Sequence, residues 1–490
     1  MDPSLAETGV AGLDDVLGGG LPRDRLHLVQ GDPGAGKTTL GLQYLLAGAA
    51  RGESTLFISL SETKAEIEAV AQSHGWSLAD VALFELSALE QTRSLEQETT
   101  LFELSEVELQ HTTRTLLGHI EQVKPQRVVF DSLSEIRLLS QSSLRYRRQL
   151  LALKQFFSGK NSTVLLLDDR TSEEGDPQLQ SLAHGVLVME QVAPLYGEDR
   201  RRLRVVKMRA RKYRGGFHDF AIRTGGLEVF PRLVAAEHHA DFEPHTISSG
   251  LQPLDQLLGG GIDRGTSTLI TGPAGTGKSV LALQYAMASA RRGECTAMFC
   301  FDEGLPTLFS RARAMGMDLP GEIEAGRVML QRIDPAEMGP GEFSWLMRRV
   351  VEEKKARVVV IDSLNGYLNA MPEYRLLSMQ MHELLTYLGQ QGVASILVLA
   401  QHGILGSMKS PVDVSYLADT VILLRFFEAG GRIRKAVSVV KKRSSLHEDT
   451  IRELVLGREG LQVGDVLRDF TGVLTGVPRF GGQLGDLIEK

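Results

Sequence analysis

The sequence predicts an α/β protein made of two tandem lobes, each a mainly parallel sheet flanked by helices. Two observations favour this class: the chain repeats itself, and each half alternates short apolar runs with longer helical patterns. A chain of 490 residues is also too long for one ordinary core, because cores stop growing at roughly 250–300 residues. At least two domains are therefore expected.

The internal repeat sets the domain boundaries. A shift of 241 residues lays 8–62 over 249–303, and 24 of these 55 positions are identical, including a Leu-Asp pair and a triple glycine. Later landmarks match at shorter shifts, so the first lobe carries a net insertion, placed in the polar, glutamate-rich stretch 91–111. The predicted parts are a first domain at 1–230, a linker at 231–248, a second domain at 249–465 and a C-terminal loop and tail at 466–490.

The linker interpretation rests on composition. The stretch 231–248 loses apolar periodicity and carries His238, His239 and His245 among carboxylates. The histidines lack regular ligand spacing, so a solvent-exposed linker is favoured over a metal site.

The expected strands are apolar at nearly every position, which is typical of strands buried on both faces. They are 26–30, 55–60, 127–130 and 162–167 in the first lobe, and 268–271, 296–301, 358–361 and 395–399 in the second.

Composition narrows the class of protein. Hydrophobic residues make up 42% and charged residues 23%, which indicates a folded chain. The formal net charge of −7 gives no basic excess, so nucleic acid is not predicted as an obligate ligand. Two cysteines cannot build a disulfide framework, and neither a signal-like N-terminus nor a run of about 18 apolar residues is present. A cytoplasmic protein that does not span a membrane is expected.

A glycine-rich loop follows the first strand of each lobe and leads into a helical segment. The loops read Gly-Asp-Pro-Gly-Ala-Gly-Lys-Thr at 31–38 and Gly-Pro-Ala-Gly-Thr-Gly-Lys-Ser at 272–279. This is the P-loop pattern, in which backbone amides surround phosphate, the lysine neutralises the β and γ phosphates, and the hydroxyl binds magnesium. The residues assigned to nucleotide binding are Gly31, Gly34, Ala35, Gly36, Lys37, Thr38, Thr39, Gly272, Gly275, Thr276, Gly277, Lys278, Ser279 and Val280. ATP and Mg²⁺ are the predicted ligands.

Carboxylates at strand ends complete each predicted site. Asp131 and Asp362 end apolar strands and are assigned, with Thr38 and Ser279, to magnesium. Glu62 and Glu303 end the strand that follows the P-loop helix and are assigned as general bases, an arrangement that resembles RecA-like ATPases. The alternative is a carboxylate that caps the next helix.

A Lys-x-Arg pair follows an apolar strand late in each lobe, as Lys207 and Arg209 and as Lys441 and Arg443. Residues two apart on a strand lie on the same side, so both cations can reach one phosphate-bearing target. A solvated edge strand is the alternative.

Together these residues resemble the KaiC family, with two RecA-like P-loop NTPase domains in one chain. The resemblance implies a hexameric double ring with ATP at subunit interfaces, hydrolysis in the first ring and Ser/Thr autophosphorylation in the second, used in signalling or circadian timing. It also implies that the Lys-x-Arg pairs act across the interface. The paired acids of the family correspond to Asp302 and Glu303 in the second lobe, but the first lobe has serine before Glu62.

The resemblance also singles out an acceptor. The segment Asp-Val-Ser-Tyr-Leu-Ala-Asp-Thr at 413–420 resembles the family's phosphoacceptor segment, which makes Ser415 the predicted acceptor. Tyr416 replaces the second hydroxyl residue of the clock pattern, so an ordered two-site cycle is not implied. The stretch 468–478 resembles the regulatory loop, but with a short tail no KaiA partner is predicted. The resemblance leaves open a KaiB-like partner that docks on the first ring, although no motif in the sequence supports it.

Two other classes remain open. One is a RecA-like motor or recombinase acting on DNA, against which stand the acidic balance and the tandem lobes. The other is a nucleotide-gated scaffold in which slow turnover only sets ring assembly.

Overall fold

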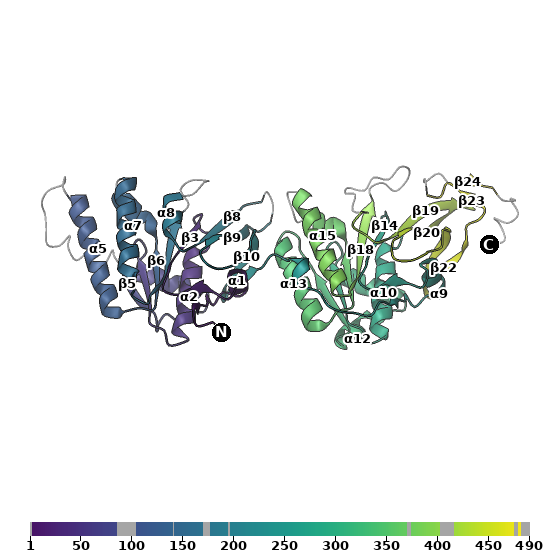
Figure 1. Cartoon of the computed structure of the whole chain (residues 1–490). Helices are drawn as coiled ribbons and strands as arrows, with labels where there is room; N and C mark the ends of the chain where they lie inside the picture. Colours follow the sequence, from purple (N-terminus) through teal and green to yellow (C-terminus); the bar gives the residue numbers. More distant parts are fainter. Residues whose placement is uncertain are drawn as a thin grey trace. The chain divides into compact units, whose positions relative to one another are not determined.

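The computed structural model describes residues 2–85, 104–140, 142–169, 177–194, 197–369, 374–401, 416–474 and 479–481. The chain divides into two compact units, Met1–Arg232 and Leu233–Lys490. In each unit helices lie on both faces of a central sheet (Figure 1).

The sheet of the first unit has nine strands among the described residues. From one edge to the other they are β5 (Ala82–Glu85), β4 (Thr55–Ser59), β6 (Arg127–Asp131), β7 (Thr163–Asp169), β3 (Leu26–Gly31), β8 (Gly185–Val192), β9 (Arg200–Met208), β10 (His218–Arg223) and β11 (Gly226–Phe230). The six strands from β5 to β8 run parallel, and β9 to β11 extend the sheet in antiparallel fashion.

The sheet of the second unit repeats this order. Its strands are β16 (Val328–Arg332), β15 (Thr296–Cys300), β17 (Val358–Asp362), β18 (Ala394–Gln401), β14 (Ser267–Pro273), β19 (Thr420–Ala429), β20 (Arg432–Lys442), β21 (Arg452–Gly457) and β22 (Gly460–Val466). The prediction of an α/β fold with two mainly parallel sheets is confirmed. The antiparallel extensions were not predicted, because strands such as β9 and β10 are only partly buried and have no continuous apolar run.

Helices cover both faces of each sheet. In the first unit they are α1 (Leu13–Leu17), α2 (Lys37–Ala49), α3 (Lys64–Ser73), α5 (Leu104–Val123), α6 (Leu133–Ser140), α7 (Ser143–Phe157) and α8 (Pro177–Leu182). In the second they are α9 (Gln252–Leu257), α10 (Lys278–Arg291), α11 (Leu305–Ala314), α12 (Leu319–Glu324), α13 (Pro340–Lys354), α14 (Leu364–Asn369) and α15 (Tyr374–Gln390).

Continuous apolar runs form the central strands because both strand faces are buried. On β6, Val129 packs into the core on the side of α1, α2 and α3, whereas its neighbours Val128 and Phe130 pack with α5, α6 and α7. Alternate residues therefore serve two different cores, which explains why apolar side chains occur at consecutive positions of the strand.

The Leu-Asp pair and the triple glycine of the repeat hold the start of each unit in place. Asp14 accepts hydrogen bonds from the Thr8 amide and hydroxyl, both 2.9 Å long, and Asp255 accepts from the Ser249 amide at 2.8 Å. At Gly261, φ is 125° and a Cβ atom would lie 2.5 Å from the Ile247 carbonyl oxygen, so only glycine fits this approach.

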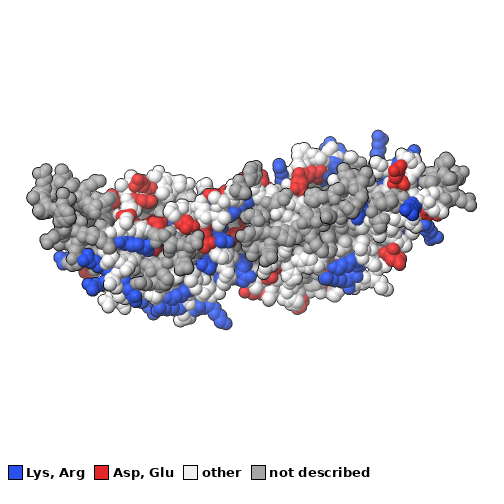
Figure 2. Space-filling model, turned by 90° about the horizontal axis from the view of Figure 1, so that it is seen from above, with Lys and Arg blue, Asp and Glu red and all other residues white. Residues whose placement is uncertain are grey.

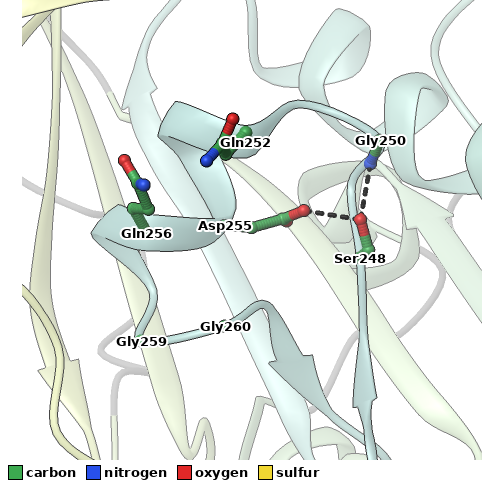
Figure 3. Close-up of a pocket in the computed structure, with 7 residues that line it drawn as sticks. All are labelled: Ser248, Gly250, Gln252, Asp255, Gln256, Gly259 and Gly260. Carbon is green, nitrogen blue, oxygen red and sulfur yellow. Dashed lines mark hydrogen bonds between the residues drawn. The ribbon is translucent and has the colours of Figure 1, made fainter.

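Asp255, Gly259 and Gly260 also line an open groove of about 710 Å³ in the second unit, shown in Figure 3. Asp255 points toward Ser248, whose hydroxyl donates to it at 2.5 Å, while Gln252 and Gln256 lie along α9. P-loop residues are not among those that line the groove. The Leu-Asp pair and the triple glycine therefore occur in both repeats for a structural reason, and not because they would bind phosphate.

The stretch proposed as a linker packs with the second unit from Leu233 onward. Leu233 and Ala235 are buried in a core of that unit, and the Ala235 amide donates to Glu383 of α15 at 2.7 Å. A short 3-10 helix, η1 (Ala235–Glu237), forms there. Of the glutamate-rich insertion, only the start of α5 falls within the described residues.

Short antiparallel pairs complete the two units. They are β1 (Leu5–Ala6) with β2 (Leu21–Pro22), β12 (Thr246–Ile247) with β13 (Ile262–Asp263), and β23 (Phe470–Thr471) with β24 (Arg479–Phe480). The last pair lies in the stretch expected to form the C-terminal loop and tail, of which residues 475–478 and 482–490 are outside the described part.

Candidate functional site

The glycine-rich loop of the first unit joins the carboxyl end of β3 to the start of α2. Gly36 has φ of 93°, a left-handed conformation that favours glycine, and it directly precedes the first turn of α2. Lys37 opens the helix with its side chain 7% exposed, and its Nζ donates to the carbonyls of Gly31 at 3.0 Å and Asp32 at 2.9 Å. The loop backbone thus holds the lysine ammonium at the place that phosphate oxygens would occupy.

The second unit repeats this loop between β14 and α10. Gly277 has φ of 105°, and Lys278, also 7% exposed, donates from Nζ to the Pro273 carbonyl at 2.7 Å. Thr276 donates to the same carbonyl at 2.8 Å. Burial lowers the pKa of Lys278 to about 8, with nearby Asp362 acting in the opposite direction, so a bound phosphate would favour the charged lysine.

The remaining assigned loop residues occupy corresponding places in the two units. They are Gly34, Ala35, Thr38 and Thr39 in the first, and Gly272, Gly275, Ser279 and Val280 in the second.

The residues assigned to magnesium lie together in both units. The Thr38 hydroxyl donates to Asp131 at 2.6 Å, and Ser279 makes the equivalent side-chain hydrogen bond to Asp362. A hydroxyl beside a carboxylate is an oxygen donor set that suits Mg²⁺. Burial raises the pKa of Asp131 to about 6, against the opposing effect of the Thr38 hydrogen bond, and it also raises the pKa of Asp362. Each site therefore holds a costly buried negative charge, which a dication would compensate.

Replacing Asp131 with Asn is expected to stabilise the nucleotide-free first unit at neutral pH. A carboxyl with a raised folded-state pKa binds its proton more tightly when folded, so its contribution to stability falls as pH rises from about 4 to about 6. The shift from 3.8 to about 6 corresponds to up to about 3 kcal/mol above that window. Amide hydrogen exchange in β3 and β6, measured at pH 4 and pH 8, checks this, because it reports on the first unit alone.

The gain in protection should be large at pH 8 and small near pH 4. The surface substitution Asp80→Asn is the matched control and should give no such trend. An Asp131→Asn variant that exchanges faster than the parent at both pH values would contradict the assignment of Asp131 as a buried, destabilising carboxylate.

The two predicted bases stand at the carboxyl edges of their sheets. Glu62 follows β4, and its Oε2 is buried without a hydrogen-bond partner among the described residues. Burial, with a smaller contribution from Glu66, raises the pKa of Glu62, which suits a base working near neutral pH. Thr63 is the cap of α3, accepting from the Glu66 amide, so the capping alternative does not apply to Glu62.

Glu303 in the second unit has a different environment. Its Oε1 accepts from Arg311 Nη1 at 2.7 Å, and its Oε2 lies 2.6 Å from Arg311 Nη2. The neighbouring Asp302 accepts a hydrogen bond from the Ser363 hydroxyl. Gly304 is the N-cap of α11 and makes no side-chain cap, so the carboxylate is held by an ion pair and not by a helix end.

In both units the P-loop follows the carboxyl end of its parallel strand. The Lys-x-Arg pair of the same unit lies at the other end of the sheet, where the parallel strands begin. Met208 pairs with Gly185, which lies level with His27 near the start of β3. The P-loop begins at Gly31, about 13 Å further along the strand at about 3.3 Å per residue. In the second unit Lys442 pairs with Thr420, which is level with Thr268 at the start of β14. Neither pair can reach the phosphate site of its own unit.

The cations are instead bound to the backbone next to them. Lys207 donates to the Gln180 carbonyl at 2.8 Å and Arg209 to the Ser181 carbonyl at 2.9 Å, both at the end of α8. Two neighbouring carbonyls therefore hold both side chains on the same side.

In the second unit, Lys441 donates to the Ala418 carbonyl at 2.6 Å and Arg443 to the Tyr416 carbonyl at 3.3 Å. Ser415, the predicted acceptor, lies outside the described residues and directly precedes Tyr416 in the chain.

One charged residue of the first site was missed by the sequence analysis. Asp169, at the end of β7, lies 2.8 Å from Lys37 Nζ, and this hydrogen bond, opposed by burial, keeps the pKa of Asp169 below its usual range. The register places Asp169 beside Gly31, whereas Ala400 pairs with the corresponding Gly272. An acidic residue ending a strand next to the P-loop strand is a signal that the sequence already carried.

Two P-loops in tandem, each followed by a strand-end aspartate and a glutamate on the next strand, define a double P-loop NTPase with RecA-like domains. A family model for the KaiC ATPase matches residues 6–234 and again 247–467. The chain therefore belongs to the KaiC family.

Curated relatives match along nearly the whole chain. The circadian clock protein KaiC3 of Synechocystis sp. is 26% identical over 97% of this chain and 95% of its own length. The circadian clock oscillator proteins KaiC of Parathermosynechococcus lividus and Synechococcus elongatus are 28% and 26% identical, each over 96% of this chain and over 87% and 91% of their own lengths.

Proposed function

We propose that this chain is a magnesium-dependent ATPase and serine autokinase that works as a ring of six subunits in signalling or circadian-type timing. The observation that carries the proposal is the separation of each phosphate site from its Lys-x-Arg pair. The P-loop and the Lys-x-Arg pair of one unit lie at opposite ends of the parallel strands. A complete catalytic centre therefore forms only when the P-loop of one subunit meets the Lys-x-Arg pair of another. A closed ring gives every subunit both contacts.

Hydrolysis in the first unit would depend on positioning and charge. Lys37 and the loop amides hold the β and γ phosphates, and Glu62 accepts the proton of the attacking water. Thr38 and Asp131 would hold magnesium, which supplies charge neutralisation at the phosphates. Lys207 and Arg209 of the partner subunit stabilise the negative charge that develops on the transferred group.

The second unit would transfer the phosphoryl group to its own chain. The Ser415 hydroxyl attacks the γ-phosphorus of ATP held by the adjoining subunit, forming a Ser–O–P bond as the bond to the ADP oxygen breaks. The hydroxyl proton passes to Glu303 of the partner subunit. Support comes from Lys441 and Arg443, which bind the backbone at Ala418 and Tyr416, within three residues of Ser415 in the chain. The acceptor and the cations are thus carried by one segment.

Phosphoamino-acid analysis after incubation of the full chain with γ-labelled ATP and Mg²⁺ tests this function. Label is expected on phosphoserine, and it should disappear in Ser415→Ala while persisting in the control Thr307→Ala, which removes an exposed hydroxyl on α11. Turnover that requires added DNA would indicate a motor, the other class of RecA-like protein. Turnover with neither label nor DNA dependence would indicate a scaffold and contradict the kinase.

The charge distribution favours the kinase over the motor. Acidic and basic side chains both occur on each unit on the face shown in Figure 2, in keeping with the formal net charge of −7.

No helix among the described residues has the length and apolar character needed to cross a bilayer.

A further inference from the structure

The two candidate bases differ in a single partner. Both oxygens of Glu303 meet the guanidinium of Arg311, at 2.7 Å and 2.6 Å, whereas Glu62 Oε2 is buried and accepts no hydrogen bond from any described residue. The pair is only partly exposed, with 26% of the Arg311 side chain and 23% of the Glu303 side chain accessible. Solvent therefore screens this ion pair less than one on the open surface.

The helix that carries Arg311 has an exact counterpart in the first unit in length and position. Under the 241-residue shift, α11 (Leu305–Ala314) covers α3 (Lys64–Ser73) without a gap, and Arg311 falls on Val70. Val70 is partly buried against the apolar core of the first unit. The first unit thus has an apolar side chain at the position from which the second unit supplies a cation.

Arg311 acts on more than one carboxylate of the second site. Its charge lowers the pKa of Asp362, against the larger effect of burial, while Glu303 and Asp302 raise it. In the first unit the charges that act on Asp131 include those of Glu62, Lys37 and Asp169. In the second unit, Arg311 adds a positive charge to the acidic group formed by Asp302, Glu303 and Asp362.

We propose that Arg311 is a positioning residue that withholds Glu303 from water and so makes the second unit the slower hydrolase of the two. This inference rests on the proposed function, in which Glu62 and Glu303 are the bases. The guanidinium lies against both carboxylate oxygens of Glu303, so an attacking water has to compete with Arg311 for contact with the base. Glu62 keeps a free oxygen and is ready to accept a proton.

The consequence is a division of work between the two units. ATP bound in the second unit is lost to water more slowly, so it persists until a serine hydroxyl is presented. Phosphoryl transfer to that hydroxyl depends mainly on positioning and charge stabilisation, so a weakened base costs it less.

The test exchanges the two side chains between the units. In a Lys37→Ala background, where only the second unit should turn over, Arg311→Val is expected to raise kcat for ATP hydrolysis about five- to tenfold with KM unchanged. This is a fraction of the 10²–10⁴ that a general base contributes in full. In a Lys278→Ala background, Val70→Arg is expected to lower kcat of the first unit. Arg311→Lys, which keeps the charge but loses the paired contact, should fall between the parent and Arg311→Val.

A rise in kcat is the informative result, because damage to folding would lower it. If Arg311→Val leaves kcat unchanged or reduced while the chain still binds ATP, the inference is overturned and the ATPase assignment stands. If the second unit shows no turnover with either residue at position 311, the proposed function of that unit fails as well. Arg311→Met replaces the valine variant if the latter does not fold.

Discussion

Alanine in place of Lys37 is expected to empty the first unit of nucleotide and leave the second unit occupied, and Lys278→Ala is expected to do the reverse. Each lysine is 7% exposed and is held among the loop carbonyls where phosphate would bind. Truncating one partner of a buried, hydrogen-bonded charge pair costs about 2–5 kcal/mol. ATP affinity in the altered unit should therefore fall roughly 30- to 5,000-fold.

The measurement is the number of nucleotides bound per chain at a concentration that saturates the parent. The parent should bind two, each single variant one, and the double variant none. Lys160→Ala, which removes a surface lysine paired with Glu121, is the control and should bind two. Two nucleotides bound in both single variants would show that the glycine-rich loops are not the nucleotide sites.

The loss of ATP affinity should differ in size between Lys37→Ala in the first unit and Lys278→Ala in the second. In the first unit, Lys37→Ala also leaves Asp169 without its cation, so two carboxylates, Asp131 and Asp169, then lie in the site. In the second unit Arg311 remains beside Asp362 when Lys278 is removed. We therefore expect the larger loss of affinity in the first unit, measured as the ratio of the two dissociation constants.

The fold and the candidate phosphate-binding loops could be predicted because their signals are local. Buried parallel strands are apolar at nearly every position, and a P-loop needs its glycines, lysine and hydroxyl residue in one continuous segment. The repeat then doubled each signal. The match of Asp131 and Asp362 to Thr38 and Ser279 followed in the same way, since strand ends at one edge of a parallel sheet converge.

The contacts that distinguish the two units could not be predicted in this way. The Asp169–Lys37 pair depends on strand register between β7 and β3, and the Arg311–Glu303 pair on the direction in which a helix leaves its strand. Comparing the two repeats identifies residues that both units share, whereas Asp169 and Arg311 each occur in one unit only. The edge at which Lys207 and Arg209 lie depends on β9 running antiparallel to β8, and apolar content alone does not give strand direction.

Replacing the arginine of either Lys-x-Arg pair is expected to abolish ATP hydrolysis in that unit while ATP binding is retained. Arg209 and Arg443 lie about 16 Å along the sheet from their own P-loops, so in the proposed ring their target is the phosphate of a neighbour. An arginine supplied in trans is worth about 10³–10⁵ in kcat. The single variant Arg209→Ala should therefore still bind two nucleotides. In a Lys278→Ala background, where only the first unit turns over, Arg209→Ala should hydrolyse almost no ATP.

Mixing two inactive variants in that background shows whether the cation comes from a neighbour. Lys37→Ala binds no ATP in the first unit but offers Arg209, and Arg209→Ala holds ATP but offers no arginine. In rings reassembled from equal amounts, about a quarter of the interfaces join an intact P-loop to an intact Arg209. Turnover should rise to about a quarter of that of the parent.

The matched control mixes Arg209→Ala with the double variant Lys37→Ala/Arg209→Ala, in which no interface contains an intact arginine. That mixture should stay inactive. If the first mixture is no more active than its components, each arginine serves its own chain, and the separation of the two sheet edges has another cause. Restored turnover would mean that the catalytic unit is the interface between two chains, because neither chain alone contains both halves of the site.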